Sequence, residues 1–178
     1  MFVRKLKIKS MKKLFFALVL IVMHEHSFSQ KITVDKIDDF TGAHIVETSY
    51  AKISDGFNCT LRKIDGRCYF STAYNCGDEI YSAKEGAEFM LKLNDGEIII
   101  LNNLEYAVAD YWSSGAPAYL SHFVLKTEYL LSPSQVAQLQ STEISVVRLY
   151  TSEGYIERIV SERNAKRLLK LFNLIKML

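Results

Sequence analysis

The sequence of 178 residues is poor in the side chains that carry catalytic and metal chemistry. It has three cysteines and four histidines, and neither the Cys-x-x-Cys nor the His-x-x-x-His spacing of a zinc site occurs. A Gly-x-Ser-x-Gly nucleophile motif, a glycine-rich phosphate loop and an Asp-x-Asp-x-Asp-Gly calcium loop are also missing. We therefore predict a non-enzymatic protein that needs no metal ion and no cofactor.

Long apolar runs are scarce as well. The run Leu14–Met23 is about half as long as the roughly twenty residues that a helix needs to cross a bilayer. Basic residues precede it, and polar and small residues follow it up to Ser29. This order is typical of a secretory signal peptide, with Met1 or Met11 as its start. No cysteine follows the run directly, which argues against a lipid anchor, and an uncleaved membrane anchor is the alternative to a cleaved signal.

The charge of the chain is unevenly distributed. The whole sequence has a net charge of +2, but residues 1–29 hold six Lys or Arg and a single Glu, so residues 30–178 have a net charge of −3. The positive charge is thus no argument for nucleic acid binding. We predict a signal peptide over 1–29 and a single domain over 30–178, exported to the periplasm or the medium. Membrane contact is expected only through the signal segment, unless that segment stays uncleaved.

Three Asp-Gly pairs, at residues 55–56, 65–66 and 95–96, indicate tight hairpin turns. If Asp65-Gly66 forms a two-residue turn, Ile64 pairs with Arg67 and the apolar residues of both strands share one face. This agreement predicts a half-buried antiparallel hairpin. Further strands are expected at 32–35, 44–53, 89–93, 97–101, 119–131, 143–151 and 155–160. We expect the run Ile98–Leu101 to be more buried than the strand before it.

Two helices are predicted among these strands. Ser132 caps a short helix that ends at Gln140, with Pro133 in its first turn. Ser161 caps a basic amphipathic helix that ends at about Met177. Its apolar face is expected to cover the sheet, with a membrane surface as the alternative, and consists of Ala165, Leu168, Leu171, Phe172 and Ile175. The predicted fold is α+β, an antiparallel meander-rich sheet or sandwich carrying both helices. A small closed β-barrel with a C-terminal helix is the alternative.

The cysteines are Cys59, Cys68 and Cys76. In the predicted hairpin Cys59 and Cys68 share a face but are offset by about 13 Å, whereas a disulfide needs Cα atoms within about 7 Å. Cys76 is therefore the candidate partner in any disulfide. The other interpretation is that Cys59 and Cys68 are small apolar side chains of the core.

Three groups of residues are candidates for function. Cys76 lies in a predicted loop, where it could act as a nucleophile. The carboxylates of Asp35, Asp38 and Asp39 cluster before Phe40, and either this cluster or Cys76 would serve a hydrolase. Aromatic residues flank a loop of small residues at 113–118 and are the candidate interaction surface; they are Tyr106, Tyr111, Trp112 and Tyr119.

Several strings of this sequence occur together in a recognisable order: Val34-Asp35, Asp39-Phe40-Thr41-Gly42, the segment 93–101, and the segment 148–156 leading into a Lys/Arg-rich final helix. In these the chain resembles small secreted proteins of unknown function from Bacteroidetes-type Gram-negative bacteria. The resemblance implies export and brings no catalytic residues. We predict an exported protein that binds a protein or envelope partner; a small-ligand-binding domain and a hydrolase are the alternatives.

Overall fold

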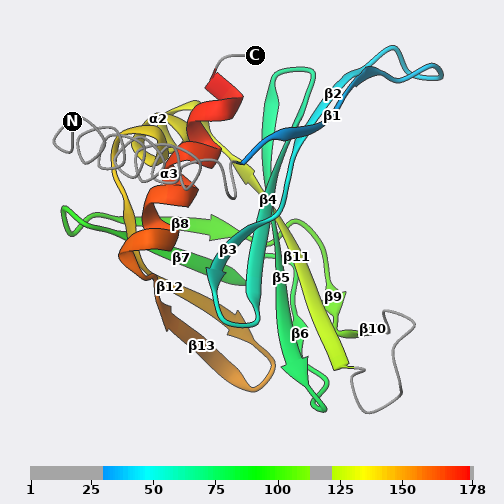
Figure 1. Ribbon diagram of the computed structural model, residues 1–178. Coiled ribbons are helices and arrows are strands. Elements are labelled where there is room, and N and C mark those ends of the chain that lie inside the picture. The colour runs from blue at the N-terminus through cyan, green and yellow to red at the C-terminus, as the bar shows by residue number, and fades with distance from the viewer. Residues whose placement is uncertain (1–29, 113–121, 177–178) are drawn as a thin grey trace, which may run out of the picture.

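Antiparallel strands make up most of the computed structural model, which describes residues 30–112 and 122–176 (Figure 1). The predicted signal peptide and the whole of the predicted loop at 113–118 lie outside these ranges. The strands are β1 (Ile32–Ile37), β2 (His44–Thr48), β3 (Ala51–Ser54), β4 (Phe57–Ile64), β5 (Arg67–Gly77), β6 (Ser82–Ala83), β7 (Glu88–Leu93), β8 (Ile98–Asn102), β9 (Ala107–Val108), β10 (Asp110–Trp112), β11 (His122–Leu131), β12 (Ile144–Thr151) and β13 (Gly154–Ile159). The helices are α2 (Pro133–Ser141) and α3 (Glu162–Lys176).

The strands form separate sheets. A seven-stranded sheet has the order β1-β2-β4-β5-β11-β10, with β3 also paired to β4. A four-stranded sheet has the order β13-β12-β7-β8, and β6 pairs with β9. All these pairs are antiparallel. The predicted α+β fold is confirmed, and the described strands do not close into the barrel that was the alternative.

The β4–β5 hairpin has the predicted register. Ile64 pairs with Arg67, and the pairing continues to Phe57 opposite Tyr74. The turn residues Asp65 and Gly66 have φ angles of 47° and 81°. A two-residue hairpin turn needs these positive angles because its twist then matches that of the strands.

The core lies between the two large sheets and α3. Phe89 of β7 stacks on Phe70 of β5 and Tyr129 of β11, with ring centroids 5.9 and 5.2 Å apart. Phe172 of α3 stacks on the same Phe70 at 5.9 Å. Offset aromatic stacking at these distances stabilises a core beyond simple area burial. The five apolar residues predicted for one face of the last helix are all buried.

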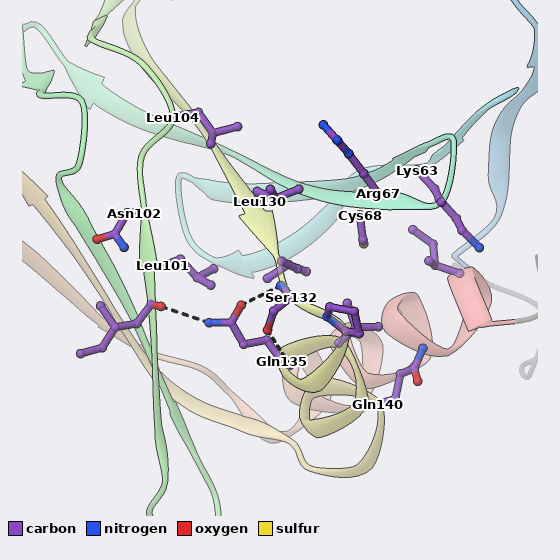
Figure 2. A pocket seen from close by; sticks show the side chains of 16 residues that line it. Lys63, Arg67, Cys68, Leu101, Asn102, Leu104, Leu130, Ser132, Gln135 and Gln140 are labelled. Atoms are coloured by element: carbon purple, nitrogen blue, oxygen red, sulfur yellow. Dashed lines mark hydrogen bonds between the residues drawn. The ribbon is translucent and has the colours of Figure 1, made fainter. Parts of the chain in front are cut away.

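The helix α2 begins with a capping box, as Figure 2 shows. The Ser132 Oγ accepts a hydrogen bond from the Gln135 backbone N–H at 3.2 Å, and the Gln135 side chain accepts one from the Ser132 N–H at 2.9 Å. These bonds satisfy donors that the first helical turn leaves unpaired. No helix among the described residues combines the length and apolar composition needed to span a membrane.

Two strand predictions need correction. The segment 44–53 forms two strands, β2 and β3, both of which pair with β4. The run Ile98–Leu101 is not more buried than β7: Ile98 and Ile100 are exposed, while Ile99 and Leu101 are buried. Burial alternates along β8 as it does along β7, because one face of the four-stranded sheet packs on the core and the other faces water. Four apolar residues in a row therefore do not mark a strand buried on both faces.

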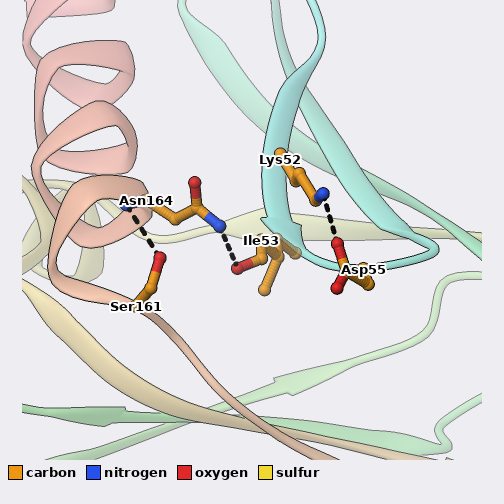
Figure 3. Close-up of polar contacts among 5 residues, drawn as sticks. All are labelled: Lys52, Ile53, Asp55, Ser161 and Asn164. Carbon is orange, nitrogen blue, oxygen red and sulfur yellow. Dashed lines mark hydrogen bonds and ion pairs between the residues drawn. The ribbon is translucent and has the colours of Figure 1, made fainter.

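The helix α3 is joined to the edge strand β3 by a buried hydrogen bond (Figure 3). The β3–β4 register shifts at Ile53, and the Asn164 Nδ2 donates to the Ile53 carbonyl at 3.1 Å. We expect Asn164→Leu to lower the free energy of unfolding by about 1–3 kcal/mol, because it leaves a buried carbonyl without this donor. Urea unfolding measures the change.

The control for this variant is Lys52→Ala. Lys52 forms an ion pair with Asp55 on the same β3–β4 hairpin, and both side chains are exposed. Exposed ion pairs of this kind contribute little to stability, so the urea midpoint should not change. Equal losses in the two variants would show that the Asn164 bond does not hold α3 to β3.

Candidate functional site

A groove of about 920 Å³ lies where β4, β5 and β11 approach β8 and α2. We call it the binding groove. It lies in the volume range typical of ligand sites, about 300–1,000 Å³. The sixteen residues that line it are Lys63, Gly66, Arg67, Cys68, Ile100, Leu101, Asn102, Leu104, Leu130, Leu131, Ser132, Pro133, Gln135, Val136, Gln140 and Ile175.

Most of the large side chains in the groove are apolar. Ile100, Leu104 and Leu130 are exposed by 44%, 40% and 44%. Leu130 and Leu131 are consecutive residues of β11, so one leucine enters the core and the other lies on the opposite face. The exposed leucines and Ile100 together make an apolar surface that water covers in the free chain. Covering such a surface with a ligand or partner is favourable, because it removes apolar groups from water.

Of the described residues that line the groove, only Lys63 and Arg67 are charged. They flank the Asp65-Gly66 turn, which fixes one at the end of β4 and the other at the start of β5. Figure 2 shows them on the side of the groove formed by this hairpin, with Leu101 and Asn102 on the opposite side. Neither cation makes an ion pair within residues 30–112 and 122–176. The groove is therefore apolar with a positive rim.

The Gln135 side chain lies between these two sides of the groove (Figure 2). Its Oε1 accepts from the Ser132 N–H, and its Nε2 donates to the Ile100 carbonyl at 3.2 Å. Gln135, which completes the capping box of α2, is thus also hydrogen-bonded to the backbone of β8. Because its side chain is held at both ends, this part of the groove is ordered before anything binds, which reduces the entropy lost on binding.

A second cavity, of about 300 Å³, lies on the outer face of the seven-stranded sheet. It is lined mainly by polar residues, and two of its charged residues, Arg62 and Glu128, pair with each other. Glu128 forms an ion pair with Arg62 at 2.6 Å and accepts a hydrogen bond from Ser71 at 2.9 Å. A ligand would have to compete with these bonds, so this cavity is the weaker candidate site.

The cysteines are part of the core. Cys59, Cys68 and Cys76 are buried free thiols, so Cys76 takes part in no disulfide and lies in β5 instead of a loop. The interpretation of Cys59 and Cys68 as small apolar core residues is confirmed by their burial. Burial raises the pKa of the Cys76 thiol, and its Sγ lies 3.5 Å from the Tyr74 carbonyl. A nucleophilic cysteine needs the opposite shift, since the thiolate is the reactive form.

The carboxylates proposed for catalysis lie on the β1–β2 hairpin and line no described groove. Asp35 pairs with His44 across the two strands, with Oδ1 and Nε2 2.7 Å apart. Asp38 accepts hydrogen bonds within its own turn, and Asp39 is exposed beside it. Among the described residues, no group of three or more His, Cys, Asp or Glu is placed to hold a metal ion.

The predicted aromatic surface is described only in part. Tyr106 and Tyr111 are exposed by 63% and 56%, and the Tyr111 ring packs edge-on against Phe123 at 5.8 Å. Trp112 ends β10 opposite His122. The Trp112 side chain and the whole of Tyr119 lie outside the described residues. Neither Tyr106 nor Tyr111 lines the binding groove.

Sequence reasoning missed the residues of the binding groove. The pair Leu130-Leu131 was a usable signal, because adjacent leucines in a strand place one of them on each face. Lys63 and Arg67 gave no signal, since basic residues beside a turn are common on solvated surfaces. That they border a groove follows from the approach of β8 and α2, which no local pattern encodes.

No protein-family model, curated protein sequence or solved structure shows significant similarity to this chain. The resemblance to small secreted Bacteroidetes-type proteins therefore stays a prediction.

Proposed function

We propose that this chain is an exported, non-enzymatic binding protein whose groove docks an acidic, partly apolar segment of a protein partner. The observation that carries the proposal is the composition of the binding groove. Among the described residues that line it, only Lys63 and Arg67 are charged, and it also carries an exposed apolar surface made by Ile100, Leu104 and Leu130. An occupant that covers the leucines and also neutralises two cations must combine apolar and anionic groups.

Export is supported by the order of basic, apolar and small residues over 1–29. A destination in the periplasm or the medium follows from that pattern in a Gram-negative cell. The proposal that the protein is not an enzyme is supported by the candidate catalytic groups. Asp38 accepts hydrogen bonds within its own turn, and the Cys76 thiol is buried. Binding is the function that the exposed apolar groove supports.

Anilinonaphthalene sulfonate, an apolar dye with a single negative charge, tests the chemistry of the groove. We expect Arg67→Glu to weaken dye binding about five- to tenfold, because the charge that faces the sulfonate is reversed. Fluorescence titration measures the affinity. The uncharged analogue phenylnaphthylamine should bind the unsubstituted chain more weakly than the sulfonate does.

Lys126→Glu is the matched control, because it makes the same change in net charge. Lys126 lies in β11 beside the polar cavity and does not line the groove. The control should leave dye binding unchanged. If both variants lose affinity equally, the dye senses overall charge and the groove is not its site. Equal binding of the neutral and anionic dyes would contradict the assigned role of the cations.

A small amphipathic acid is the second candidate occupant, and the volume of the groove favours it. Dodecanoate is a suitable probe, since its tail matches the leucines and its carboxylate matches the cations. If it binds, the thermal midpoint of the chain should rise with its concentration and Arg67→Glu should reduce the rise. No rise at any concentration would exclude this candidate.

A further inference from the structure

The β1–β2 hairpin projects from the body of the protein and ends in an exposed phenylalanine (Figure 1). Phe40 lies in the turn and is 98% exposed, so it has almost no contact with its own chain. Ile37, at the end of β1, is 59% exposed. An aromatic side chain held in water at the end of a hairpin contributes no packing to its own fold. It is the kind of residue that anchors a contact with a partner.

The turn that carries Phe40 is ordered by its own hydrogen bonds. The Asp38 Oδ1 accepts from the backbone N–H of Phe40 at 3.1 Å, and from the N–H and the hydroxyl of Thr41 at 2.8 Å each. The Gly42 N–H donates to the Asp38 carbonyl at 2.8 Å, and Gly42 has a φ of 72°, which suits glycine. The bonds from Thr41 lower the pKa of Asp38 and keep it charged. The ring is thus presented by an ordered, negatively charged turn.

We propose that the binding groove receives this hairpin tip, residues 38–43, from a second copy of the same chain. The inference rests on the proposed function and names the acidic, apolar segment that the groove would dock. The two surfaces are complementary: the tip offers Phe40 beside Asp38 and Asp39, and the groove offers exposed leucines beside Lys63 and Arg67. Asp39 has no ion-pair partner among the described residues, as is also true of both cations.

The contact joins two different surfaces, so two copies can exchange tips reciprocally or add head to tail. The ring of one phenylalanine and its flanking residues cover much less area than the roughly 1,200–2,000 Å² of a stable interface. The association is therefore weak and depends on protein concentration. A partner with a larger matching surface would displace the second copy from the groove. Self-association therefore covers the apolar surface of the groove while no partner is bound.

Sedimentation velocity of the full chain, up to millimolar concentration, tests the proposal. Phe40→Ala removes the anchor, and the double variant Arg67→Glu with Leu104→Gln removes the receiving site. Each variant alone should associate at least about tenfold more weakly than the unsubstituted chain. An equimolar mixture of the two should regain association, because one variant keeps a groove and the other keeps a tip. Because each variant keeps only one of the two surfaces, the mixture should form complexes of two chains and none larger.

Tyr50→Ala is the control, since it truncates an exposed aromatic residue outside both surfaces. It should associate like the unsubstituted chain. A second test reverses charge: Asp39→Lys and Arg67→Glu should each weaken association, and both changes in one chain should restore it. No recovery in the mixture, or equal loss with Tyr50→Ala, would overturn the inference.

The result separates this inference from the proposed function. If the chain stays monomeric while the anionic dye still binds in an Arg67-dependent way, the groove stands and the second copy is the wrong occupant. If dye binding also ignores Arg67→Glu, the groove itself is wrongly assigned and both proposals fail.

Discussion

Phe89→Ala is expected to destabilise the protein by about 3–5 kcal/mol, a large part of the roughly 5–15 kcal/mol that holds a domain folded. The Phe89 side chain is fully buried, and its ring packs against Phe57, Phe70 and Tyr129 at centroid distances of 5.9, 5.9 and 5.2 Å. These neighbours belong to the opposite sheet. Truncation therefore opens a cavity between the two sheets, which the surrounding strands can fill only in part.

Phe40→Ala is the matched control, because it makes the same truncation on a ring that is 98% exposed. Its effect on the free energy of unfolding should stay within about 0.5 kcal/mol. Urea unfolding followed by circular dichroism measures both variants. A loss below about 1 kcal/mol for Phe89→Ala would mean that the sheets do not share this core. The control also shows that the tip variant used for self-association is folded.

Local patterns were enough to predict much of the fold. The register of the β4–β5 hairpin followed from the Asp65-Gly66 turn and the alternation of apolar residues, because a one-residue slip would have moved Cys59 and Leu61 to the solvated face. The cap at Ser132 and the buried face of α3 followed from short-range rules in the same way. In each case the determining interactions lie within one hairpin or one helix.

Longer-range features were not predictable in this way. The run Ile98–Leu101 suggested a strand more buried than the one before it, but its burial depends on which face of the four-stranded sheet the core covers. The groove depends on the approach of β8, β11 and α2, which come from three separate parts of the chain. Phe40 in an Asp/Thr/Gly turn was visible in the sequence. That its hairpin projects from the body became clear only with the position of β1 and β2 at the edge of the seven-stranded sheet.

The three native thiols are expected to react with iodoacetamide about a hundredfold more slowly in the folded protein than after unfolding in guanidinium, at about pH 8. Burial raises the pKa of Cys68 from 9.0 to about 11, and the nearby Lys63 only partly opposes the shift. Burial also raises the pKa of Cys59 and Cys76. The thiolate fraction falls about tenfold for each unit by which the pKa rises. In the native protein the rate should still increase with pH above 8, because the thiols remain mostly protonated there.

Asn58→Cys supplies the control thiol, one residue from Cys59 but on the exposed face of β4. It should be alkylated in the folded protein at nearly the rate of an unfolded chain, as intact mass would show. Fast modification of Cys76 in the native protein would contradict the burial of this thiol and return it to consideration as a nucleophile. A native mass two hydrogens below the reduced mass would instead reveal a disulfide.

Slow alkylation also bears on export. Three cysteines in an oxidising compartment invite mispairing, and an odd number leaves at least one thiol unpaired. Here Cys59 and Cys68 lie on the same sheet face but pair with Thr72 and Lys63 across the strands, and not with each other. Burial keeps the thiols protonated and away from oxidants. An exported protein with this sequence can thus remain reduced without a reducing compartment.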